Sequence, residues 1–169
     1  STSASTMVST APSGSTTPTK TKPSGGYAYY KDGTLTLNSY TNTGAAHSYK
    51  VDSYGDTWCS AIYGSADLNI VLTANTTNTI TNGVASSSGG YFSMGISVEG
   101  KLTITGEGSL SVATESSSGW AMTAKQISVN CESVTANGSI YVSDNGALSM
   151  ELSGSFFSDR YIQAGTINI

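Results

Sequence analysis

The chain repeats a short pattern in which an apolar, a polar and an apolar residue follow one another. This alternation has the two-residue period of a β-strand with one buried face. The copies of this first phrase are Leu35-Thr36-Leu37, Leu68-Asn69-Ile70, Leu102-Thr103-Ile104, Ile127-Ser128-Val129, Leu148-Ser149-Met150 and Ile167-Asn168-Ile169. Their spacing shortens from 33 and 34 residues to 25, 21 and 19. Such repeats predict stacked units that bury their apolar faces against one another.

Two further strand-like phrases run in phase with the first. Copies of the second are Ala61-Ile62-Tyr63-Gly64, Gly95-Ile96-Ser97-Val98, Ala121-Met122-Thr123-Ala124, Ser139-Ile140-Tyr141-Val142 and Tyr161-Ile162-Gln163-Ala164, and Tyr27-Ala28-Tyr29 is a candidate for its first copy. Copies of the third are Thr79-Ile80-Thr81, Leu110-Ser111-Val112, Val134-Thr135-Ala136 and Phe156-Phe157. Three short strands per repeat predict an all-β fold, a parallel β-helix of about six coils over residues 27–169.

Stacking these coils predicts two interior ladders of apolar side chains. The first ladder contains Leu35, Leu68, Leu102, Ile127, Leu148 and Ile167. The second contains Leu37, Ile70, Ile104, Val129, Met150 and Ile169.

Composition indicates the compartment and the class of partner. Charged residues make up 11% of the chain, the net charge is −4, and no basic cluster occurs, which argues against nucleic-acid binding. Abundant Gly, Ser, Thr and Asn favour an extracellular β surface. No stretch approaches the length of a transmembrane helix, so membrane insertion is not expected. Residues 1–26 hold fourteen Ser or Thr and all three prolines, which predicts a linker or an extended arm.

The two cysteines, Cys59 and Cys131, raise the question of a disulfide. The repeats place them two coils apart, about 9–10 Å along the axis, which exceeds the separation of roughly 7 Å between Cα atoms that a bridge allows. A long loop at Cys59 would be needed to close the gap. The alternative is that both are small buried apolar residues.

The surplus length of the longer coils enters at one place, before the strands that carry Ile62, Ile96 and Met122. These insertions, Asn38–Ser60, Asn82–Met94 and Ala113–Gly119, should therefore lie beside one another at one corner of the stack. Their aromatic residues are candidates for a sugar-binding surface, because pyranose rings stack on aromatic faces. The candidates are Tyr40, Tyr49, Tyr54, Trp58, Tyr91 and Trp120. The alternative is a satellite core that packs the loops against the stack.

Asp52 and Asp56 lie in the first insertion and are candidate calcium ligands, but regular Asp spacing is missing and a solvated loop is the alternative. The other carboxylates are scattered, and His47 is the only histidine. Neither a carboxylate pair nor a Ser/His/Asp triad is indicated. We therefore expect no enzyme and no cofactor other than calcium.

Several stretches resemble bacterial repetitive proteins. Tyr30-Lys31-Asp32-Gly33-Thr34-Leu35-Thr36-Leu37-Asn38-Ser39-Tyr40 is similar to the opening phrase of surface proteins of gut and rumen Firmicutes. Residues 66–72, 78–83 and 95–110 resemble bacterial carbohydrate-binding β-helix domains. The resemblance covers roughly residues 30–135. It implies a right-handed parallel β-helix used for attachment to polysaccharide, with calcium in some members.

These observations predict a non-catalytic, extracellular or cell-surface module that binds polysaccharide or cell-wall glycan, as an adhesin does. A structural subunit is the alternative. The strand at Ile167–Ile169 is followed by no capping element, so coils of neighbouring molecules could stack end to end into a filament, with the N-terminal arm adding a strand.

Overall fold

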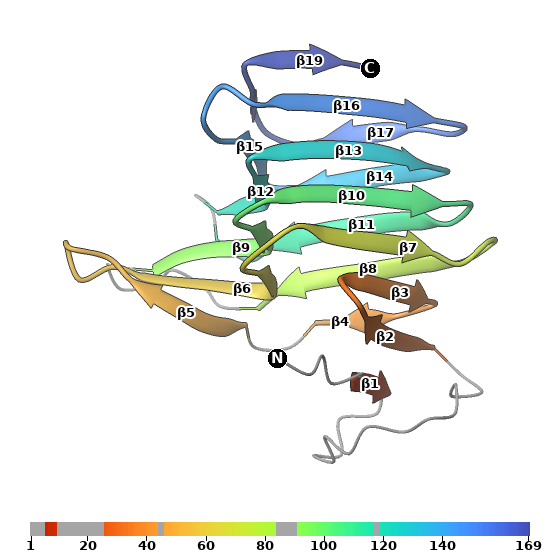
Figure 1. Cartoon of the computed structure of the whole chain (residues 1–169), viewed down its shortest axis with the longest axis horizontal. Helices are drawn as coiled ribbons and strands as arrows, with labels where there is room; N and C mark the ends of the chain where they lie inside the picture. Colours follow the sequence, from red (N-terminus) through yellow and green to blue (C-terminus); the bar gives the residue numbers. More distant parts are fainter. Residues whose placement is uncertain (1–5, 10–25, 44–45, 84–90, 117–118) are drawn as a thin grey trace.

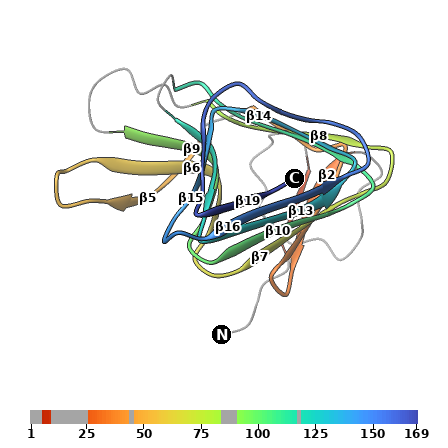
Figure 2. The same ribbon diagram turned by 90° about the horizontal axis from the view of Figure 1, so that it is seen from above.

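The computed structural model describes residues 6–9, 26–43, 46–83, 91–116 and 119–169. These residues form strands and turns, and no helix occurs among them. The strands make three sheets, named A, B and C below, which enclose a common interior and give a roughly triangular outline in Figure 2.

Sheet A has eight strands and contains every copy of the first phrase. In order across the sheet they are β1 (Thr6–Ser9), β2 (Tyr27–Lys31), β3 (Thr34–Asn38), β7 (Leu68–Leu72), β10 (Lys101–Gly106), β13 (Gln126–Cys131), β16 (Ala147–Leu152) and β19 (Thr166–Asn168). The strands from β3 to β19 are parallel, because the chain passes through the other two sheets before it returns to sheet A. The first phrase therefore marks one column of parallel strands, as predicted.

Sheets B and C contain the third and second phrases. Sheet B consists of β4 (Thr41–Asn42), β8 (Thr77–Asn82), β11 (Ser109–Thr114), β14 (Ser133–Asn137) and β17 (Phe156–Ser158). Sheet C consists of β5 (His47–Val51), β6 (Thr57–Gly64), β9 (Tyr91–Val98), β12 (Trp120–Ala124), β15 (Ser139–Val142) and β18 (Ile162–Gln163). From β7 onward each strand pairs in parallel with the strand three further along the chain (Figure 1). The fold is thus all-β with largely parallel sheets, which is compatible with stacked coils.

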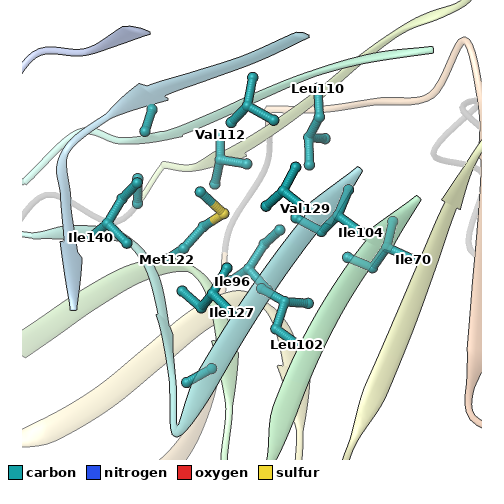
Figure 3. Packing of buried hydrophobic residues seen from close by; sticks show 14 of the residues in the cluster. Ile70, Ile96, Leu102, Ile104, Leu110, Val112, Met122, Ile127, Val129 and Ile140 are labelled. Atoms are coloured by element: carbon teal, nitrogen blue, oxygen red, sulfur yellow. The ribbon is translucent and has the colours of Figure 1, made fainter. Parts of the chain in front are cut away.

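The interior is filled by the apolar residues of the three phrases. Leu102 is fully buried and faces Leu68 on one neighbouring strand and Ile127 on the other. Figure 3 shows side chains from all three sheets, such as Ile104, Val112 and Met122, directed into this shared core. From β7 to β16 both predicted ladders are confirmed. The inward apolar residues of neighbouring strands therefore form continuous columns that cover the inner face of each sheet.

The predicted ladders differ from the structure at both ends of sheet A. The predicted register is wrong at β3, whereas at β19 Ile167 lies opposite Leu148 as predicted but is not buried. Leu35 lies opposite Ile70, and Leu37 opposite Leu72, so β3 is shifted by two residues from the predicted register. A shift of two residues keeps the same side chains inward, so the alternating pattern alone does not exclude it. At the other end, Ile167 and Ile169 are 46% and 74% exposed, because no described strand packs beyond β19.

The segment Tyr27–Tyr29 is not the first copy of the second phrase. It belongs to β2, which pairs with β3 in an antiparallel hairpin of sheet A. Asp32 and Gly33 form the two-residue loop, with φ of 48° and 77°. Two residues with positive φ make the turn typical of antiparallel hairpins, and parallel strands need a much longer connection. Within the predicted linker or arm, β1 pairs antiparallel with β2, while residues 1–5 and 10–25 lie outside the described residues.

The two cysteines are buried free thiols in different sheets. Cys59 lies in β6 of sheet C, and Cys131 lies at the end of β13 in sheet A. The Sγ of Cys59 contacts the carbonyl oxygen of Phe92 at 3.6 Å. Burial raises the pKa of the Cys131 thiol to about 11. Both residues therefore behave as the small buried apolar residues of the second alternative.

Candidate ligand-binding site

The described residues of the three insertions lie between strands of sheet B and strands of sheet C. Each insertion connects a strand of sheet B to the next strand of sheet C, from β4 to β6, from β8 to β9 and from β11 to β12. The first insertion contains β5, which pairs antiparallel with β6, and the two strands project from the stack (Figures 1 and 2). We call residues 47–60 the hairpin arm. Only this arm gives sheet C an antiparallel strand.

Asp52 closes the turn of the hairpin arm. Its Oδ1 accepts backbone N–H groups from Tyr54 at 2.9 Å and from Asp56 at 3.0 Å. Its Oδ2 accepts the indole N–H of Trp58 at 3.2 Å. The indole hydrogen bond is the largest of the effects that hold the pKa of Asp52 below its ordinary value of 3.8. The turn and the indole are therefore bound to one ionised carboxylate at neutral pH.

Four aromatic rings from four strands lie together on the outer face of sheet C, and we call them the aromatic row. Trp58 of β6 lies 5.0 Å from Phe92 of β9 and 5.9 Å from Trp120 of β12, measured between ring centroids. Trp120 is nearly parallel to Phe92 at 6.0 Å and to Tyr141 of β15 at 5.2 Å. Such offset or tilted contacts are favourable for aromatic rings. The row crosses the strands, so it extends along the axis of the stack.

A second aromatic pair fixes the hairpin arm to sheet C. The rings of Tyr49 and Tyr63 stack at 4.1 Å with an angle of 16° between their planes. The Tyr49 hydroxyl forms a 2.9 Å hydrogen bond with the Ser97 hydroxyl, and the Tyr63 hydroxyl donates to Oε1 of Glu99 at 2.8 Å. Burial raises the pKa of Tyr49 to about 12, and the hydrogen bond to Glu99 raises the pKa of Tyr63. Both hydroxyls are therefore neutral at physiological pH.

A groove of about 490 Å³ lies between the hairpin arm and the outer face of sheet C. Aromatic, hydroxyl and charged side chains share its lining. The aromatic ones are Tyr49, Trp58, Trp120 and Tyr141, the hydroxyl ones include Ser97, Thr123 and Ser143, and the charged ones are Lys50, Glu99 and Lys125. The Nζ of Lys50 lies 4.8 Å from the centroid of the Trp58 ring. This volume is within the range of small-molecule and sugar subsites.

The predicted ligand-binding residues divide into two groups. Tyr49, Trp58 and Trp120 come together in the groove. Tyr40 and Tyr54 do not. Tyr40 packs against the interior, and its backbone N–H donates to Asn78, while Tyr54 is 91% exposed in the turn of the hairpin arm. The side chain of Tyr91 lies outside the described part of the chain.

The groove also contains residues that the insertions did not indicate. These are Ser97, Thr123 and Tyr141, which line the groove from one outward column of the second phrase. Tyr63 belongs to the same column but is not part of the lining. The signal was present, because outward residues of neighbouring copies must form one column when coils stack in register. The insertions do not indicate these residues, because they lie on the outer face of the strands.

The described part of the chain adds no third carboxylate or other metal-ligating side chain to the candidate calcium ligands Asp52 and Asp56. Among the described residues, no three His, Cys, Asp or Glu side chains are close enough together to hold a metal ion. Both carboxylate oxygens of Asp52 already accept N–H donors, which suits a structural role in the hairpin arm. The aromatic rings of the groove can contact the apolar face of a ligand, and its hydroxyl groups can form hydrogen bonds with the polar groups of that ligand.

Comparisons of the chain with protein-family models, curated proteins and solved structures find no match. In the described part of the chain there is also no helix with the length and apolar character needed to cross a membrane.

Proposed function

We propose that the chain is a right-handed parallel β-helix of about six coils that acts as a non-catalytic, extracellular polysaccharide-binding module of the adhesin type. The stepwise pairing of strands through sheets A, B and C supports the β-helix. The groove supports the binding function. In the proposal, a cell-wall or plant polysaccharide lies along the aromatic row and contacts the hydroxyl groups beside it.

The observation that carries this proposal is the combination of ring faces and neutral polar groups in one groove. Trp58, Trp120 and Tyr141 come from three strands of a sheet, so their relative positions are set by strand spacing. A site on paired strands is more rigid than a site on loops, which lowers the entropic cost of binding. Ser97 and Thr123 supply hydroxyl groups in the same lining.

The proposed location outside the cell rests on composition. The chain has few charged residues and abundant Gly, Ser and Thr, including the Ser/Thr/Pro-rich residues 1–26. Such tracts commonly serve as linkers or stalks of secreted proteins. The resemblance of residues 30–135 to bacterial surface domains agrees with this location.

The test is retention of the purified chain on insoluble plant and bacterial cell-wall polysaccharides. Trp58→Ala should weaken retention about tenfold, since an aromatic contact of about 1.4 kcal/mol corresponds to that factor. Tyr54→Ala is the matched control, because Tyr54 is an aromatic residue of the same arm that lies outside the groove. The control variant should be retained like the wild type.

Thermal unfolding of the same variants separates binding from a satellite core. The proposal expects Trp58→Ala to lose retention with a small fall in the melting temperature. Wild-type protein that is retained on none of the polysaccharides, or retention that falls only in proportion to stability, would contradict the binding proposal and support the satellite core.

The second candidate function is end-to-end association into a filament. It is favoured by apolar side chains exposed on the last described turn, which are Phe157, Tyr161, Ile167 and Ile169. At the opposite end, however, β2 pairs with the edge of β3 and β5 pairs with the edge of β6. Antiparallel strands at these edges restrict the addition of a further parallel coil. Negative-stain microscopy and sedimentation should show monomers if binding is the function, and regular fibres would favour the filament.

A further inference from the structure

The two oxygens of the Asp52 carboxylate have different partners. Oδ1 accepts the backbone N–H groups of Tyr54 and Asp56, so it stabilises the turn of the hairpin arm. Among the residues that the structure describes, Oδ2 accepts a hydrogen bond from the indole N–H of Trp58 alone, six residues further along the chain on β6. One carboxylate thus connects the turn to the Trp58 ring in the groove. A substitution can therefore remove the contact of Oδ2 and keep the contacts of Oδ1.

We infer that Asp52 is a positioning residue that fixes the plane of the Trp58 ring in the wall of the groove and so controls ligand binding. This inference rests on the proposed function. Trp58 is only partly buried, and its ring meets Phe92 and Trp120 at tilted angles of 39° and 58°. Tilted contacts define the plane of a half-exposed ring less strictly than a directional hydrogen bond does.

The charged groups around Trp58 agree with an ionised Asp52. Lys50 of β5 holds its Nζ over the indole ring and also favours the charged form of Asp52. Asp56 lies in the same turn, and Glu99 and Lys125 line the groove across from the arm. Because the pKa of Asp52 is below 3.8, its hydrogen bond to the indole persists at neutral pH and is lost only in acid.

Asp52→Asn separates positioning from folding of the turn. The amide oxygen of asparagine can still accept the two backbone N–H groups, whereas its NH₂ group cannot accept the indole N–H. Asp56→Asn is the matched control, because it removes one carboxylate from the same turn and Asp56 contributes only its backbone to the hydrogen bonds described here. Both variants have the same change in net charge.

The first measurement needs no ligand. The chain has two tryptophans, so its ¹H–¹⁵N spectrum contains two indole resonances, and Trp58→Phe assigns them. Asp52→Asn should shift the Trp58 indole resonance upfield, and Asp56→Asn should not. In the wild type the same resonance should shift as the pH falls below 3.8, with no such shift in Asp52→Asn. An unchanged resonance in Asp52→Asn would overturn the inference.

The second measurement is retention on polysaccharide. Asp52→Asn should weaken retention about threefold, as expected for one lost hydrogen bond. Trp58→Phe, which keeps a ring but lacks the N–H, should do the same, and the double variant should be no weaker than either single one. This second route applies even if Asp52→Asn folds poorly.

The outcomes distinguish the inference from the proposed function. Full retention of Asp52→Asn and Trp58→Phe, in a protein that Trp58→Ala impairs, overturns the positioning role alone. Full retention of Trp58→Ala overturns the proposed function, and the positioning role in binding falls with it, while the indole resonance still reports whether the hydrogen bond exists.

Discussion

The inside of the sheets and the outer face of sheet C use different side chains for different tasks. Inside, aliphatic residues such as Ile70, Leu102 and Met122 are fully buried and repeat from strand to strand. Outside, Trp58 and Tyr141 are half-buried and lie beside hydroxyl and charged groups. The two regions share the same strands, because successive residues of a strand point to opposite faces.

Under the proposed function, this difference separates stability from ligand binding. From β7 to β16 the inward apolar side chains are buried, so burial of apolar area stabilises the fold and these residues can be exchanged only for others of similar shape. The outer face needs only to keep its rings in place. Substitutions inside should therefore affect folding strongly, and substitutions on the outer face should affect it much less. Three further experiments test this comparison.

The largest effect is expected from Leu102→Asp. Leu102 is fully buried between two strands, so the substitution places an unpaired carboxylate in the core and should cost about 5 kcal/mol or more, enough to unfold the domain. Thr103→Asp is the matched control on the outer face of the same strand and should be tolerated. Circular dichroism and thermal melts measure both, and equal damage would mean that the assigned face is wrong.

A smaller but clear effect is expected from Gly106→Ala. Gly106 has a φ of 115°, and an added Cβ would overlap the carbonyl oxygen of Leu72 on the neighbouring strand. We expect a loss of about 3 kcal/mol in the free energy of unfolding, because backbone strain and a steric clash combine. Gly33→Ala is the control, since Gly33 also has positive φ but an added Cβ there meets no atom within 4 Å. Its cost should be about 1 kcal/mol.

The smallest effect is expected from Tyr49→Phe on the outer face. The variant keeps the stack with Tyr63 but loses the hydrogen bond to Ser97, which should cost about 1 kcal/mol at pH 7. Burial raises the Tyr49 pKa from 10.0 to about 12, so the folded state keeps this proton while the unfolded state releases it. The contribution of Tyr49 is complete below pH 10 and is lost as the pH rises toward 12.

Chemical denaturation between pH 8 and 12 measures this dependence. The stability of the wild type should fall more steeply than that of Tyr49→Phe above pH 10. Ser97→Ala is the control, because it removes the same hydrogen bond but leaves the titrating hydroxyl. Parallel curves for wild type and Tyr49→Phe would show that Tyr49 is not buried between the hairpin arm and the outer face of sheet C.

The strands were predictable because their signal is repeated. Each copy of the first phrase places an apolar residue on the inner face, and repetition makes a chance pattern improbable. The register of β3 was not predictable in the same way, because the strand can shift by two residues while Leu35 and Leu37 both stay inward. The hairpin of β2 and β3 had its own signal in Asp32-Gly33, which indicates a two-residue turn between strands.

The site was only partly predictable. Trp58 and Trp120 could be predicted because aromatic residues gather in the insertions and directly after them. The stack of Trp120 on Tyr141 could not, because it follows from stacking neighbouring coils in register and not from any local motif. The role of Asp52 could not be predicted from the sequence, because its hydrogen bond to Trp58 depends on the turn of the hairpin arm that brings residues 52 and 58 together.

The Asp32-Gly33 hairpin also has a consequence for the order in which the protein folds. Its contacts join residues only 3 to 11 positions apart, from Lys31 with Thr34 to Tyr27 with Asn38. Pairing β3 with β7 instead joins residues 35 apart, such as Leu35 and Ile70. Closing a short loop costs less entropy than closing a long one. The hairpin can therefore form early and present the edge of β3 as a template on which the parallel strands assemble one after another.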